Sequence, residues 1–145
     1  MDYIDRSALV PYSQKEMFDL VSDVDSYPRF LNWCSAAEVL SQEGAEVTAR
    51  IEFIVGGLRK SFTTRNRHIE HEEIAMHLVE GPFSELEGSW RFSPLGKDGC
   101  KISLRLEYDF SNRMVKLVIA PVFGQIANSL VDSFQKRAVE VYGER

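Results

Sequence analysis

Alternation of apolar and polar residues dominates the middle of the chain. In the run "AEVTARIEFIV", residues 45–55, the odd positions are apolar and most of the even positions are polar. A period of two predicts a β-strand with one buried face. The same alternation recurs over residues 58–69, 73–80, 86–95 and 101–110. Because the connections between these segments are short, they predict one antiparallel sheet.

The link between the first two of these strands contains Gly56-Gly57, a dipeptide typical of a two-residue hairpin turn. Such a turn places Ile51 opposite Phe62 on the same face of the sheet. It also places Glu46 opposite Arg67. The register therefore predicts one apolar and one solvated face.

The beginning of the chain predicts a strand followed by two short helices. The strand covers residues 3–10 and stops before Pro11, which lacks a backbone donor. Ser13 precedes Glu16 by three residues, the spacing of a capping box at the start of a helix. A second helical turn is expected over residues 25–31, with Pro28 near its start.

The last part of the chain predicts a single long helix. Ser111 or Asn112 would cap its start and Gly143 would end it, which gives roughly 30 residues and about 45 Å of helix. The apolar face of the sheet requires a cover, and this helix is the only long element left. At 100° per residue one apolar stripe should face the sheet. The stripe contains Ala120, Phe123, Ala127, Leu130, Val131, Phe134, Ala138 and Val141.

The first half of this helix is apolar on its other side as well, where Met114, Val118, Pro121 and Val122 lie. One interpretation is ordinary core packing under a loop. The other is a loosened doorway to a cavity between sheet and helix, which touches a membrane surface or a partner during loading. A cavity would be favoured by the small residues expected to point inward. These are Ala45, Ala49, Gly88 and Ala127.

Composition and charge narrow the class of protein. A chain of 145 residues, 44% hydrophobic, is of a size to form one α+β domain over residues 1–145. A net charge of −5 gives no general attraction to phosphate backbones. Cys34 and Cys100 have no metal-ligand spacing, which favours a reducing, cytoplasmic setting. No apolar run reaches the roughly 20 residues of a spanning helix, so an integral membrane protein is not expected.

Four runs give the chain a resemblance to a known family. They are "VSDVDSYPRFLNWC", "LVEGPFSELEGSWRFSPL", "YDFSNRM" and "SFQKRAVEVYG". In this order they resemble the coenzyme Q-binding and ribosome association toxin RatA family, of the START-like, polyketide cyclase-like superfamily. The resemblance implies a helix-grip (START-like, Bet v 1-like) fold. In that fold a curved antiparallel sheet wraps a long C-terminal helix, and two short helices follow the first strand.

The resemblance also implies function. It implies a hydrophobic tunnel that binds ubiquinone or a related isoprenoid lipid as ligand, in support of respiratory electron transport and with no cofactor required. It further implies an alternative role, in which the protein binds the large ribosomal subunit and blocks subunit association. The expected location is the cytoplasm, peripheral to the inner membrane. The chain departs from the family pattern at Asn32 and Pro121, which bears on the position of the tunnel mouth.

Aromatic and aliphatic residues at inward positions are the candidate ligand contacts, because lipid pockets are mostly apolar. Simple core packing is the alternative for several of them. The candidates are Phe30, Trp33, Phe53, Phe62, Met76, Phe83, Trp90, Phe92, Leu104, Leu106, Phe110, Phe123, Ala127 and Leu130.

The solvated face carries the candidate ribosome contacts Arg59, Lys60, Arg65 and Arg67. Part of this positive charge could be neutralised by cross-strand pairing, since Glu46 should lie opposite Arg67. A local stripe of arginines could instead contact RNA phosphates despite the negative total charge.

The sequence does not favour an enzyme. It contains no H-x-H or H-E-x-x-H spacing, and no catalytic residue or metal site is predicted. Only His68 and Glu80 could both point inward by alternation and serve a cyclase-like or aromatase-like proton transfer. We expect a non-enzymatic lipid-binding protein.

Overall fold

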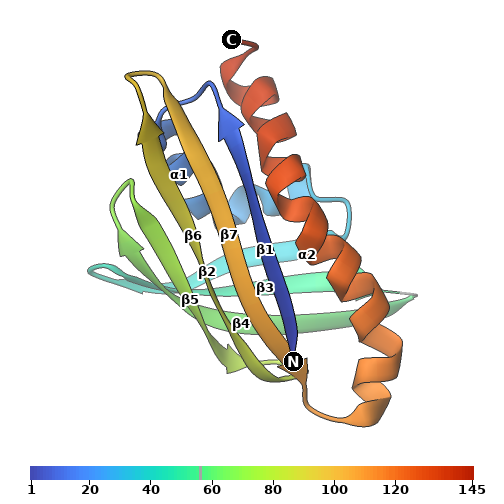
Figure 1. Cartoon of the computed structure of the whole chain (residues 1–145). Coiled ribbons are helices and arrows are strands. Elements are labelled where there is room, and N and C mark those ends of the chain that lie inside the picture. Colours follow the sequence, from blue (N-terminus) through green and yellow to red (C-terminus); the bar gives the residue numbers. More distant parts are fainter. Residues whose placement is uncertain (56) are drawn as a thin grey trace.

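The computed structural model describes residues 1–55 and 57–145. Seven antiparallel strands form one sheet in the order β1-β7-β6-β5-β4-β3-β2 (Figure 1). The strands are β1 (Asp2–Val10), β2 (Cys34–Glu43), β3 (Glu46–Val55), β4 (Leu58–Ile69), β5 (Glu73–Glu80), β6 (Phe83–Leu95) and β7 (Gly99–Phe110). The helices are α1 (Gln14–Ser22), the 3₁₀ helix η1 (Val24–Arg29) and α2 (Arg113–Tyr142).

The sheet is strongly curved. In Figure 1, β2, β3 and β4 cross at a steep angle to β1, β6 and β7, and α2 lies across the hollow side. The long helix thereby covers the apolar face, as an antiparallel sheet with one solvated face requires. The predicted helix-grip fold, with two short helices after the first strand, is confirmed.

The predicted register of the first hairpin is confirmed. Ile51 pairs with Phe62, and Glu46 pairs with Arg67. The predicted turn includes Gly56, which lies outside the described residues. Its neighbour Gly57 has a φ of +82°, a left-handed conformation that glycine adopts without strain.

Strand β2 was not predicted from the sequence. All of its residues except Cys34 and Ala37 are exposed, so no apolar alternation marks it. It forms an edge of the sheet, and its pairing with β3 shifts register twice, at Cys34/Ala36 and at Val39/Ser41. A strand that buries neither face lacks the signal on which the other predictions depended.

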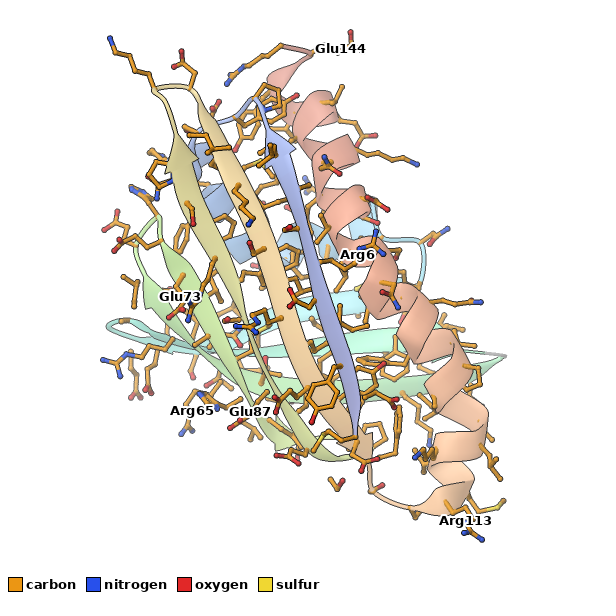
Figure 2. All side chains as sticks on the ribbon, viewed as in Figure 1. Arg6, Arg65, Glu73, Glu87, Arg113 and Glu144 are labelled. Carbon is orange, nitrogen blue, oxygen red and sulfur yellow. The ribbon has the colours of Figure 1, made fainter. Side chains whose placement is uncertain are left out.

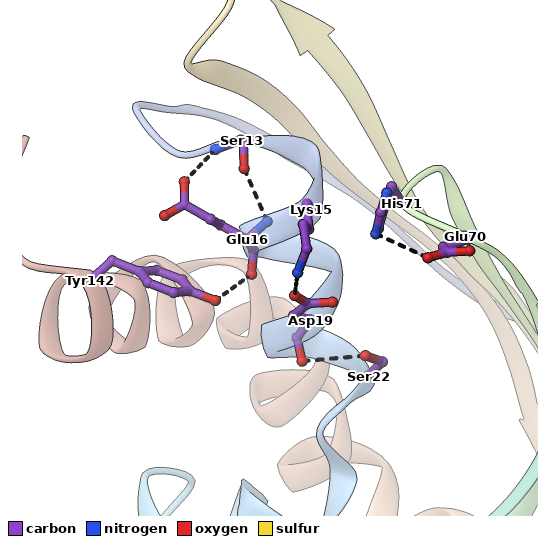
Figure 3. A network of polar contacts seen from close by, with 8 residues as sticks. All are labelled: Ser13, Lys15, Glu16, Asp19, Ser22, Glu70, His71 and Tyr142. Carbon is purple, nitrogen blue, oxygen red and sulfur yellow. Dashed lines mark hydrogen bonds and ion pairs between the residues drawn. The ribbon is translucent and has the colours of Figure 1, made fainter.

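The predicted capping box opens α1. The Ser13 hydroxyl accepts from the backbone N–H of Glu16 at 3.1 Å, and the Glu16 carboxylate accepts from the Ser13 N–H at 2.9 Å (Figure 3). Two bonds of 2.7 Å from the Arg145 guanidinium hold the pKa of Glu16 down to about 2. The Tyr142 hydroxyl donates to the Glu16 carbonyl at 2.8 Å. The start of α1 is thus fastened to the end of α2.

Helix α2 follows its predicted bounds. The Asn112 side chain accepts from the Val115 N–H at 2.9 Å, and the helix continues through Pro121 to its C-cap at Gly143. Its fully buried residues are Ile119, Phe123, Ile126, Ala127, Val131, Phe134 and Ala138.

The predicted apolar stripe of α2 is wrong at several positions. Ile119 and Ile126 are buried although they were left out, and Val141 is 49% exposed. Ala120 and Leu130 are only half-buried. Because the sheet curves, different strands contact α2 along its length, and its buried face rotates with them.

The first turns of α2 expose apolar side chains. Met114 is 72% exposed, Leu117 69% and Val118 48%. An 18-residue window of this helix is long and apolar enough, by length and composition, to cross a membrane, contrary to the sequence-based expectation. Part of that window is buried in the domain, and the core helix of a globular protein meets the same criterion.

Candidate ligand-binding cavity

A cavity of about 100 Å³ lies between the sheet and α2. Its wall is mostly apolar and takes residues from the short helices, from five strands and from α2. The wall consists of Val21, Ser22, Val24, Tyr27, Trp33, Ala49, Ile51, Phe53, Phe62, Thr64, Asn66, His68, Ile74, Met76, Leu86, Trp90, Leu104, Leu106, Phe123, Ile126, Ala127, Leu130 and Phe134.

The size of the cavity sets what it holds in this conformation. Engineered apolar cavities of about 150 Å³ bind a benzene-sized molecule, whereas drug-sized ligands occupy roughly 300–1,000 Å³. A single ring or one isoprene unit is therefore the matching scale. A longer ligand requires the wall to move.

Most of the predicted contacts lie in this wall. Alternation placed the strand residues correctly, since Phe53, Phe62 and Trp90 all point to the hollow side. The predicted residues that line the cavity are Trp33, Phe53, Phe62, Met76, Trp90, Leu104, Leu106, Phe123, Ala127 and Leu130.

Phe83 and Phe110, which were predicted as ligand contacts, do not line this cavity. Their rings stack on each other with centroids 5.3 Å apart. Phe83 also meets Phe123 edge-on at 5.0 Å. These rings point inward as predicted, but they fill the space between the sheet and the first half of α2 with aromatic contacts.

Phe30 and Phe92 are also outside the wall. The Phe30 ring lies 5.3 Å from the ring of Phe134, and the Arg137 guanidinium lies 5.0 Å from its centroid on the outer side. Phe92 packs edge-on against Phe18 of α1 at 5.8 Å. Each ring is shielded from the cavity by an element that is distant in sequence.

Trp33 reaches both the cavity and the surface. It is half-buried, and its carbonyl accepts from the Ile54 N–H at 3.1 Å. Its indole Nε1 is buried and has no hydrogen-bond partner in the described part of the chain. Neither Asn32 nor Pro121, the two departures from the family pattern, lines the cavity, and both are exposed.

The polar residues of the wall come mainly from β4. The hollow side of β4 presents every second residue, and after Phe62 these are Thr64, Asn66 and His68. Of these three residues, only His68 was predicted from the sequence to point inward. Thr64 and Asn66 could have been identified from the sequence, because polar side chains at inward positions of a strand are uncommon in an apolar interior.

The arrangement does not support the predicted acid-base pair. Burial lowers the pKa of His68, whose ring meets Phe18 edge-on at 5.5 Å. Glu80 is exposed, so its predicted inward position is wrong. A register shift between Thr63 and Thr64 breaks the alternation at that end of β5. Burial also raises the pKa of the Cys100 thiol to about 11, which disfavours a thiolate nucleophile.

The small residues play different parts. Ala49 and Ala127 line the cavity, whereas Ala45 is exposed in a turn. A Cβ added to Gly88 would lie 2.2 Å from the carbonyl oxygen of Arg105. Gly88 therefore allows β6 to approach β7 closely, and its absent side chain does not enlarge the cavity.

The candidate ribosome contacts lie on both faces of β4. Arg65 projects from the outer face, away from α2 (Figure 2). The Arg59 guanidinium pairs with Glu52 at 3.3 Å. Lys60 pairs in register with the inward Phe53, so it does not share the face of the arginines. Arg65 and Arg67 are exposed, and within residues 1–55 and 57–145 neither forms an ion pair. Arg67 and Glu46 therefore lie opposite each other in the strand register, but no ion pair between them is found among the described residues.

Comparison with known proteins agrees with this fold and site. Residues 10–135 match the family model described as polyketide cyclase / dehydrase and lipid transport. The ribosome association toxin RatA of Pseudomonas aeruginosa is 45% identical over 97% of this chain and 98% of its own length. The mitochondrial coenzyme Q-binding protein COQ10 homolog B of Xenopus laevis is 26% identical over 96% of this chain and 59% of its own length.

A solved structure shows the same architecture. The Zhui aromatase/cyclase from Streptomyces sp. R1128 superposes with a TM-score of 0.83, at 14% identity, over 94% of this chain and 93% of its own. At that identity the likeness concerns the fold alone. Sequence and structure together show that the chain belongs to the polyketide cyclase, dehydrase and lipid transport family, in the branch that contains the RatA toxins.

Proposed function

We propose that this protein binds an isoprenoid lipid, ubiquinone or a related quinone, in the cavity between the sheet and α2. The apolar cavity itself carries the proposal. A coenzyme Q-binding protein among its relatives supports it. The protein would shelter the ligand in the cytoplasm, in peripheral contact with the inner membrane, in support of respiratory electron transport.

Burial of apolar surface is sufficient as a mechanism. Each buried methylene contributes about 0.8 kcal/mol, so one fully buried isoprene unit contributes roughly 4 kcal/mol. Sequestration needs no bond to form or break. On this proposal the protein acts as a carrier, and its function includes no catalysed step.

We propose that a longer isoprenoid tail leaves the cavity along the helix, which requires the aromatic contacts of Phe83 with Phe110 and Phe123 to open. Phe123, Ile126 and Ala127 line the cavity from α2, and the turns before them carry exposed apolar side chains. Arg113 and Lys116 lie beside these side chains. Apolar groups flanked by basic residues suit the surface of an anionic membrane. We propose this helix start as the site of contact during loading.

Filling the cavity tests the proposal. Ala127 is 1% exposed in the wall, and Ala127→Phe would occupy the space of a ligand ring. Organic extracts of the purified wild type should contain quinone by mass spectrometry, and extracts of Ala127→Phe should not. Ala75→Phe, on the outer face of β5, is the matched control. Folded wild type that carries no quinone and takes up none when it is added would refute the proposal.

Binding to the large ribosomal subunit is the second candidate. It is favoured by the name of the RatA relatives and by the exposed Arg65 and Arg67 on the outer face. Guanidinium groups suit contact with RNA phosphates. Co-sedimentation with ribosomal subunits on sucrose gradients tests it, and wild type that stays at the top of the gradient would exclude this role.

A further inference from the structure

The polar side chains of β4 lie in an apolar surrounding. Asn66 is 7% exposed and Thr64 is 5% exposed, and both line the cavity. Across the strands Asn66 faces Val47 on one side and Met76 on the other. Buried amides almost always have hydrogen-bond partners, so an amide in this position needs an explanation.

The amide group of Asn66 is only half satisfied. The Thr64 hydroxyl donates to the Asn66 Oδ1 at 2.9 Å, which fixes the orientation of the amide. In the described part of the chain, Asn66 makes no other side-chain hydrogen bond. Its Nδ2 carries two further N–H donors, on a side chain that lines the cavity.

We infer that Asn66 donates a hydrogen bond to an acceptor oxygen on the ring of the ligand, with Thr64 as the residue that positions its amide. This inference rests on the proposed function and names the class of ligand. The preferred ligands are apolar molecules with a ring carbonyl, such as a prenylated quinone. A plain hydrocarbon of the same shape leaves the donor unpaired.

Two probes with the same skeleton test the inference. One is a benzoquinone with a single isoprene unit, and the other is the corresponding prenylbenzene without oxygens. Calorimetric titration should show that the wild type binds the quinone more tightly. Asn66→Leu keeps the volume and removes the donor, so affinity for the quinone should fall about tenfold while affinity for the hydrocarbon stays equal or rises.

Ala75→Leu is the control, because Ala75 adjoins the β5 residue that pairs with Asn66 but lies on the outer face and does not line the cavity. It should change both affinities by less than about threefold. Thr64→Val should lower the ratio of quinone to hydrocarbon affinity, by less than Asn66→Leu does. A merely structural role for Thr64 would lower both affinities and leave the ratio unchanged.

The outcomes separate this inference from the proposed function. Wild type that binds neither probe would overturn the proposed function and the inference with it. Wild type that binds both probes, with a ratio that Asn66→Leu leaves unchanged, would overturn the inference alone. Thermal unfolding verifies that each variant is folded, and Asn66→Ala provides the same comparison if Asn66→Leu does not fold.

Discussion

The two faces of β4 differ sharply, although they belong to the same twelve residues. The hollow face presents Phe62, Thr64 and Asn66 to the cavity, where each side chain has fixed neighbours. The outer face presents Arg65 and Arg67 to solvent. The first face suits recognition by shape and a few hydrogen bonds, and the second suits contact through charge.

This difference teaches that one strand can serve two kinds of partner without conflict. Successive side chains point to opposite faces of a sheet. A change on one face therefore leaves the other face nearly intact, provided that the backbone keeps its register. The two proposed roles can be tested independently for this reason.

The largest contrast is expected in stability, between Trp90 and its neighbour Arg91 on β6. Trp90 is 4% exposed, and its ring lies 5.3 Å from that of Phe134. Trp90→Ala should lower the free energy of unfolding by about 3–5 kcal/mol. Arg91 only pairs with Glu73 at the surface, at 2.9 Å, so Arg91→Ala should cost about 0–1 kcal/mol. Urea unfolding measures both, and equal losses would contradict the division of the faces.

The next contrast concerns partners. The double variant Arg65→Glu and Arg67→Glu should weaken binding to the large ribosomal subunit about thirtyfold in co-sedimentation, since two lost phosphate contacts of order 1 kcal/mol each cost about 2 kcal/mol. Its quinone content should equal that of the wild type. Asn66→Leu should show the reverse pattern. If the charge reversal leaves co-sedimentation unchanged, the outer face of β4 is not the contact.

A smaller contrast concerns pH. Burial lowers the pKa of His68 below its ordinary value of 6.5, so the unfolded chain binds a proton more readily than the folded one. Stability attributable to His68 is therefore complete above pH 6.5 and declines as the pH falls below it.

Urea unfolding of the wild type at pH 7.5 and pH 5.5 should reveal this decline, and His68→Gln should reduce it. His77→Gln is the control, since that ring lies on the outer side of β5 and is exposed. A decline that persists unchanged in His68→Gln would assign it to other groups.

The smallest effect on stability is expected at the start of α2. Leu117 is 69% exposed, and Leu117→Asp should change the free energy of unfolding by no more than about 0.5 kcal/mol. Flotation with vesicles that contain anionic lipid should nevertheless decrease. Asn128→Asp, exposed further along the same helix, is a control of equal charge change. Equal flotation of all three proteins would argue against this membrane contact.

The sequence predicted the strands that bury one face and missed the strand that buries none. Residues 58–69 alternate because one face of this strand is buried under α2, so the hydrophobic pattern predicts the strand. Strand β2 is held by backbone pairing with β3, and most of its side chains are exposed, so its sequence needs no apolar alternation. The position of β2 depends on its pairing with β3, so the hydrophobic pattern of β2 itself does not predict a strand.

The sequence predicted which side chains of the candidate site point inward, but not which of them line the cavity. Alternation correctly turned Phe92 and Phe110 inward, whereas Phe83 is inward because a register shift separates it from Glu85. Whether an inward ring borders a cavity or packs on another ring depends on elements far away in the chain, such as Phe18 on α1 and Phe123 on α2. Thr64 and Asn66 occupy the same inward positions of the alternation as Phe62, so the sequence also contains the signal for a polar row in the cavity wall.

The shape of β2 has a consequence for how copies of the protein behave in a crowded solution. An open sheet leaves edges whose unpaired backbone groups can recruit a second sheet and begin aggregation. Two register breaks bend this edge, and Glu38 and Glu43 give it negative charge. At this edge neighbouring molecules therefore find no flat strand on which to stack. The fold can therefore keep an apolar cavity in an open sheet while this edge strand resists aggregation.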